Sequence, residues 1–137
     1  MSKFTEITMT VGDAIELYKG LEAVKKHKGA RFAIIVGRNM KELFRLLKEY
    51  ENMAKPSEEF MHLSAKAHKL AEAEDEEGIK ALEAENEALI ESRKNQLAEL
   101  EDALKNEVVL SLETIREDQL PEEITGEEIV PILPIVV

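Results

Sequence analysis

Two long stretches of the chain carry apolar residues at helical spacing, and they limit the possible folds more than any other feature. Between Ala30 and Ala54 the apolar side chains recur every three or four residues, as a continuous seam on one helix face requires. They are Phe32, Val36, Met40, Leu43, Leu47 and Tyr50. Pro56 disfavours helical backbone at Lys55 and so ends this helix. A second seam predicts the longest helix, from about Ile79 to Asn106.

Helices of this length span roughly 40 Å, which a chain of 137 residues cannot bury along its whole extent. We therefore expect a single domain, 1–137, in which a long antiparallel helical hairpin over about 30–106 projects from a base. Residues 1–29 and 107–137 form that base. A shorter helix, capped by Ser57, lies inside the hairpin and is expected to bury Phe60, Leu63, Ala67 and Leu70.

The base combines strand and helix signals. Phe4–Thr10 alternates apolar and polar residues, as does the segment 107–115, and pairing them gives a small two-stranded antiparallel ribbon. A helix from about Val11 to His27 follows the first strand, and Gly29 ends it. Near the C-terminus a capping box opens a short helix, and the apolar tail 129–137 must be buried against its own fold or a partner. The expected class is mainly α (α+β), with four helices, the ribbon, a short C-terminal helix and the tail.

Several function classes are excluded by composition and by missing motifs. The chain has no cysteine, which excludes a disulfide scaffold, thiolate metal sites and a cysteine nucleophile. No apolar run approaches the ~18 residues that span a bilayer, and the polar segment 1–10 is no signal peptide. Phosphate-binding glycine loops, nucleophile elbows and zinc-protease motifs are absent. We expect a cytoplasmic or virion-associated protein that is not an enzyme, with no cofactor, metal or membrane contact.

A single Glu-x-x-His, Glu59 to His62, has the spacing that di-iron helical bundles use. Those proteins need a second copy of the motif, and this chain has one. His62 is therefore expected to be a partly exposed helix residue and not a metal ligand.

The net charge of −11 hides an asymmetry along the chain. Residues 1–56 carry eleven basic and seven acidic residues, whereas 57–137 carry seven basic and twenty-two acidic ones. The overall acidity argues against nucleic acid or an anionic membrane as a partner. The two halves attract each other, within one fold or between subunits, and the basic half leaves room for a local anion site.

The strongest functional signal is a basic stripe on the helix 30–54. It consists of Arg31, Arg38, Lys41, Arg45 and Lys48, with Asn39 beside it. Arginine forks suit bidentate recognition of phosphate or carboxylate, and lysine adds a point charge. The stripe could therefore grip a phosphorylated ligand or an acidic partner. The alternative is a ladder of surface ion pairs, each weak, with Glu83, Glu87 and Glu91 of the longest helix.

Two polar residues interrupt the seam of the longest helix. Asn86 and Arg93 share that seam with Leu97 and Leu100. A polar residue in a seam commonly fixes register or oligomeric state. A buried arginine needs an acidic partner or an anionic ligand. We expect these four residues to form the seam of a homo-oligomer.

The order of elements resembles a group of small, mostly uncharacterised bacteriophage and prophage proteins. The resemblance spans nearly the whole chain and is carried by three segments. They are the basic, Phe/Ala-rich opening of the second helix with its Arg-Asn pair, Arg31–Asn39; the acidic helix running into a strand, Leu97–Leu110; and the tail with Leu120-Pro121 and Ile132–Ile135. The resemblance implies a phage origin, and no catalytic residue can be carried over from it.

Two functions follow as hypotheses. The first is a non-enzymatic phage binding protein, oligomeric, that captures an anionic ligand such as a nucleotide signal, or a host factor, through the basic stripe. The second is a virion structural or assembly protein that acts through protein–protein contacts. In the first, Arg38→Glu or Arg45→Glu would abolish binding without unfolding the chain, whereas the second is insensitive to both.

Overall fold

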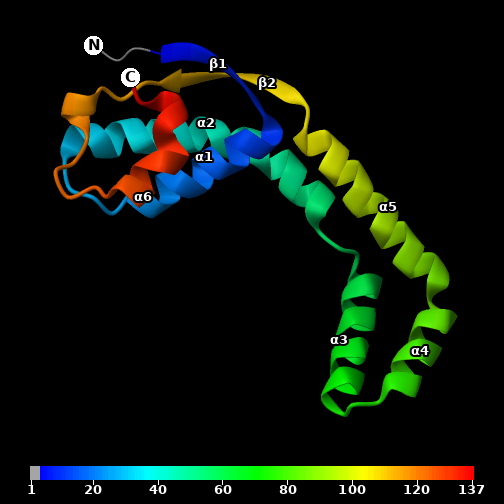
Figure 1. Cartoon of the computed structure of the whole chain (residues 1–137). Helices are drawn as coiled ribbons and strands as arrows, with labels where there is room; N and C mark the ends of the chain where they lie inside the picture. The colour runs from blue at the N-terminus through cyan, green and yellow to red at the C-terminus, as the bar shows by residue number, and fades with distance from the viewer. Residues whose placement is uncertain (1–3) are drawn as a thin grey trace. The chain divides into compact units, whose positions relative to one another are not determined.

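A computed structural model describes residues 4–137 as a mainly helical chain with one small antiparallel sheet (Figure 1). The elements in chain order are β1 (Phe4–Thr10), α1 (Val11–Val24), α2 (Ala30–Ala54), α3 (Glu58–Glu72), α4 (Glu76–Glu85), α5 (Glu87–Leu104), β2 (Glu107–Glu113), the 3-10 turn η1 (Glu117–Gln119), α6 (Gly126–Ile129) and the 3-10 helix η2 (Val130–Ile135). The chain divides into two compact units. The first unit is Met1–Tyr50 with Ala103–Val137, and the second unit is Glu51–Asp102.

The two-stranded ribbon expected from the ends of the chain is confirmed. β1 and β2 pair antiparallel, with Phe4 opposite Glu113 and Thr10 opposite Glu107. Alternation along the strands sends Met9, Leu110 and Leu112 into the core. A ribbon of two strands is marginal alone and needs this packing against helices.

The core of the first unit is almost entirely aliphatic. It is built from one face of α1, one face of α2, the inner side of the ribbon and the C-terminal tail. Its fully buried side chains include Leu17, Leu21, Phe32, Ile35, Leu43, Leu112, Ile115, Ile132 and Ile135. Thr10 caps α1, since its Oγ accepts the Asp13 N–H at 3.1 Å. The helix ends at Val24, earlier than the expected His27, and Gly29 occupies the turn to α2 with a φ of 123°.

One side of the C-terminal tail is buried against its own chain. η2 packs on α1, with Ile132 and Ile135 at 0% exposure. The Ile115 N–H donates to the Ile135 carbonyl at 2.7 Å, and the Val137 N–H donates to the Ile115 carbonyl at 2.8 Å. The capping box at Thr125 and Glu128 is confirmed at the start of α6.

The second unit contains α3, α4 and α5, and here one expectation is wrong. The helix expected to run unbroken from Ile79 to Asn106 is two helices, divided at Asn86, whose φ of −123° and ψ of 28° are not helical. The Asn86 side-chain amide donates to the Leu82 carbonyl at 2.8 Å. Asparagine competes for backbone groups in this way, which favours a helix end over a helix interior. The described residues thus form six α-helices, more than the four and one short helix expected.

No helix in residues 4–137 combines the length and the apolar character needed to cross a membrane.

Candidate functional site

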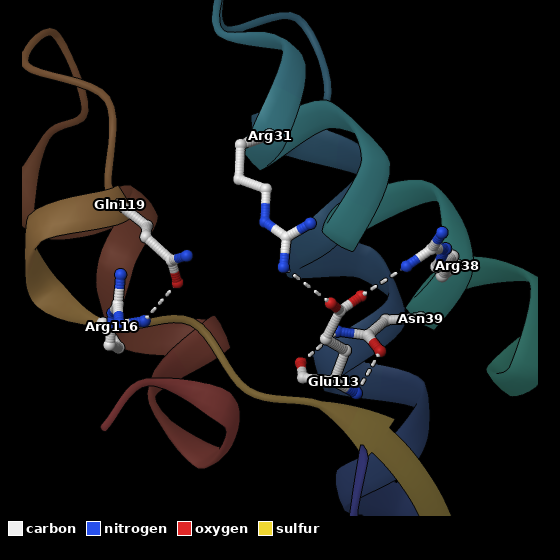
Figure 2. Close-up of polar contacts among 6 residues, drawn as sticks. All are labelled: Arg31, Arg38, Asn39, Glu113, Arg116 and Gln119. Carbon is white, nitrogen blue, oxygen red and sulfur yellow. Dashed lines mark hydrogen bonds and ion pairs between the residues drawn. The ribbon is translucent and has the colours of Figure 1, made fainter. Parts of the chain in front are cut away.

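Two arginines of α2 converge on one buried carboxylate at the end of β2 (Figure 2). Arg31 Nη2 lies 3.4 Å from Glu113 Oε1, and Arg38 Nη1 lies 3.5 Å from Glu113 Oε2. The Glu113 side chain is 1% exposed, whereas those of Arg31 and Arg38 are 46% and 48% exposed. Because residues seven apart lie on the same helix face, α2 presents both guanidinium groups to the same carboxylate.

Asn39 holds the backbone of Glu113 in place. Its Nδ2 donates to the Glu113 carbonyl at 2.8 Å, and its Oδ1 accepts the Glu113 N–H at 2.8 Å. The amide therefore bonds the last residue of β2 much as a neighbouring strand would, as Figure 2 shows. Asn39 is itself 1% exposed, so both hydrogen bonds are shielded from water.

The charge at this cluster is unbalanced. Two guanidinium groups share one carboxylate, which leaves one positive charge on a half-exposed surface. Each guanidinium has five N–H donors. Among the described residues Arg31 and Arg38 each make one hydrogen bond, near the upper limit of bonding distance. The remaining donors can therefore bind a further anion.

The other members of the basic stripe do not reach Glu113. Lys41, Arg45 and Lys48 are exposed farther along α2, and Arg45 pairs with Glu42 at 3.5 Å. The structure thus brings together Arg31, Arg38 and Asn39 of the six residues expected to bind a ligand. The alternative ion-pair partners Glu83, Glu87 and Glu91 belong to the second unit, and that ladder stays a prediction.

Sequence reasoning missed Glu113. The sequence carries no signal for this contact, because Glu113 falls at a polar, outward-facing position in the alternation that places Leu110 and Leu112 on the core side. Leu112 and Glu113 are consecutive and both buried, so one of them departs from the alternation of the strand.

The polar residues of the expected oligomer seam have partners inside the second unit. Asn86 bonds to the carbonyl of Leu82, as described above. Arg93 Nη1 donates to the Ala54 carbonyl at 3.0 Å and to Gln96 Oε1 at 2.8 Å, and the guanidinium lies 5.7 Å from the centre of the Phe60 ring. The Arg93 hydrogen bond satisfies the carbonyl group of Ala54, the last residue of α2. Of the seam leucines, Leu97 is 44% exposed and Leu100 is half-buried.

A groove of about 760 Å³ also lies in the second unit. Its lining carries both charges, with Lys55 and Arg93 on one hand and Glu91 and Glu99 on the other. Such a groove has less electrostatic preference for an anion than the Arg31–Arg38 surface, where the excess charge is positive.

Apart from the Glu113 cluster, a contact between His27 and Glu128 also joins distant parts of the first unit. His27 Nε2 lies 2.9 Å from Glu128 Oε2, and both side chains are largely buried. The hydrogen bond with His27, followed by that of the Thr125 backbone, lowers the pKa of Glu128 below its ordinary value of 4.5. The contact joins the turn that follows α1 to α6 and so helps to hold the tail. In the part of the chain that the structure describes, no three His, Asp or Glu side chains gather as a metal site would require.

This contact predicts acid sensitivity. Because the pKa of Glu128 is lower in the folded chain, its stabilisation is fully present above pH 4.5 and is lost as the pH falls through the folded-state value. We expect Glu128→Gln, which keeps the capping box, to lower the free energy of unfolding at neutral pH and to flatten its decline between about pH 5 and about pH 3. Urea unfolding at several pH values across this range measures the free energy of unfolding and its dependence on pH. The exposed neighbour Glu127→Gln is the control, and an equal slope in Glu128→Gln and the unmodified chain would contradict the assignment.

Comparison of the chain with protein-family models, with curated proteins and with solved structures gives no match.

Proposed function

We propose that the chain is a non-enzymatic binding protein that captures an anionic ligand on the basic face of α2, centred on Arg31 and Arg38. The observation that carries this is the pair of half-exposed guanidinium groups held by a single buried carboxylate. Glu113 fixes their orientation without neutralising both. A site with oriented donors and excess positive charge binds an anion without first ordering long side chains.

The geometry favours a compact, multiply charged anionic group such as a phosphate. Phosphate offers several acceptor oxygens, so it can take hydrogen bonds from both arginines at once. From Arg31 to Lys48 the stripe extends along α2 for about 26 Å, at 1.5 Å per residue. A small ligand such as a nucleotide signal contacts the Arg31–Arg38 end, and the other basic residues add attraction at longer range. A host factor with an acidic surface would use the whole stripe.

The test begins with the protein purified from cells that make it in its natural setting. Native mass spectrometry is expected to find an added phosphorylated mass, and calorimetric titration with pyrophosphate measures binding directly. Arg38→Gln and Arg31→Gln should each weaken pyrophosphate binding by roughly 10- to 100-fold, the value of a charged hydrogen bond. Glutamine is preferred to glutamate because a second carboxylate beside buried Glu113 would destabilise the fold.

Two further variants make this test specific. Lys19→Gln removes an exposed charge of α1 that pairs with Glu16, and binding should be unchanged. Arg45→Glu distinguishes a small anion from an acidic protein. It should change pyrophosphate binding little, whereas it should strongly weaken binding of an extended acidic protein surface. No added mass together with no pyrophosphate binding would refute the proposal, as would full binding by Arg38→Gln.

The second candidate function is a virion structural or assembly protein, in keeping with the resemblance to phage proteins. What supports it is the set of apolar side chains left exposed around the tail, Val130, Leu133 and Val137. These, with the long helical hairpin expected over about 30–106, would contact other subunits. Recovery of the chain in purified particles, unaffected by Arg38→Gln, would favour this function over ligand capture.

A further inference from the structure

The second unit has almost no core of its own. Among residues 51–102, Leu63 is the one buried side chain, and α4 and α5 bury none. Apolar residues line these helices at core-like spacing, yet they are covered only in part. Helices with such seams are stabilised by burying them, so the second unit has apolar surface that a further chain can cover.

One stripe of α5 combines this exposed apolar surface with ordered charge. Ile90, Lys94, Leu97 and Glu101 follow one another at intervals of four, three and four residues and so lie on one face of α5. Leu97 is 44% exposed at the centre, and Ile90 is half-buried. Lys94 and Glu101 are exposed on either side of Leu97, and among residues 4–137 neither forms an ion pair.

We propose that a second copy of the chain covers this stripe, with the two α5 helices antiparallel and centred near Leu97. In this orientation Lys94 of each copy faces Glu101 of the other, and the two Leu97 side chains meet. A parallel pair would instead place lysine against lysine and glutamate against glutamate. Two copies of the stripe therefore match in charge only when the two helices run in opposite directions. This self-complementarity favours a copy of this chain over an unrelated partner.

The composition of the second unit favours this orientation. It carries six basic and fifteen acidic residues, so two copies repel each other in general. Self-association therefore depends on placing the few basic residues opposite acidic ones. The proposal is independent of the anion site, which lies on α2 of the first unit.

Sedimentation equilibrium of the full chain tests whether two copies associate through this stripe. The unmodified chain should be a dimer at micromolar concentration, and Leu97→Asp should weaken the dimer by roughly 100-fold, as for the loss of a central apolar contact. Ala98→Asp, an exposed substitution one position away and off the stripe, is the matched control and should remain dimeric. Circular dichroism shows whether each variant keeps its helices.

Charge exchange tests the orientation. Lys94→Glu alone and Glu101→Lys alone should each dissociate the dimer, because each places like charges together twice. The double variant should restore it, and mixing the two single variants should give a heterodimer in which both ion pairs re-form. An unmodified chain that is monomeric at about 100 μM, a dimer that survives Leu97→Asp, or single variants that do not associate when mixed would each overturn the proposal. Arg38→Gln should leave the dimer intact, which separates this result from that of the anion site.

Discussion

Gly20→Val is expected to destabilise the first unit by about 3 kcal/mol, because it forces the C-terminal tail away from α1. A Cβ atom at Gly20 would lie 2.6 Å from Pro131 Cβ and 3.1 Å from Ile132 Cγ2. Valine adds two more carbon atoms to this crowded position. If the tail undocks, Ile132 and Ile135 become exposed, and each buried isoleucine contributes about 1.5–3 kcal/mol.

The control is the same substitution in an open position. Gly37 lies on the exposed face of α2, and a Cβ there would meet no atom within 4 Å. Gly37→Val should therefore change stability by less than about 0.5 kcal/mol, since valine is a slightly better helix former than glycine. Comparable losses in Gly20→Val and Gly37→Val would show that the tail is not packed on α1 as described.

Tyrosine fluorescence measures the first unit selectively during urea unfolding. The chain has two tyrosines and no tryptophan, and Tyr18 and Tyr50 both belong to the first unit. Tyr18 packs beside Phe44, with ring centres 6.4 Å apart, so unfolding changes its surroundings. Circular dichroism follows the helices of both units. A shift in the fluorescence transition with little change elsewhere would place the effect of Gly20→Val in the first unit.

Local signals in the sequence were sufficient for most helix starts and for the ribbon. The bounds of α2, the caps at Thr10 and Ser57 and the capping box at Thr125 follow from short-range chemistry. Asn86 was different, because an asparagine at a seam position is equally compatible with a register-fixing residue and with a helix end. Only the competition between its amide and the backbone, which depends on the surrounding chain, decides between the two.

The sequence predicted the arginines of the candidate site but not the carboxylate that they contact. Helical spacing places Arg31 and Arg38 on one face of α2, but it does not tell which residue they meet 75 or more positions later. Glu113 is brought to them by the pairing of β2 with β1 and by the packing of that ribbon on the helices. Such long-range contacts are set by the whole first unit, so a single strand pattern could not reveal them.

Asn39→Leu is expected to cost about 3–4 kcal/mol, because it leaves the N–H and the carbonyl of Glu113 buried without partners. Leucine has the same branching at Cγ as asparagine and is somewhat larger, so no cavity forms; the loss comes from the missing hydrogen bonds, and any crowding adds to it. Asn52→Leu, on the exposed part of the same helix, should be nearly neutral and serves as control.

The same variant links stability to ligand capture. Without the Asn39 amide, the end of β2 loses the bonds that hold Glu113 beside Arg31 and Arg38, and the two guanidinium groups lose their common anchor. Pyrophosphate binding by the folded fraction of Asn39→Leu should therefore weaken along with its urea midpoint, although Asn39 is buried and cannot touch the ligand. A folded Asn39→Leu protein that binds pyrophosphate as tightly as the unmodified chain would mean that the arginines bind without the support of Glu113. A midpoint equal to that of Asn52→Leu would mean that the two buried hydrogen bonds contribute little to the fold.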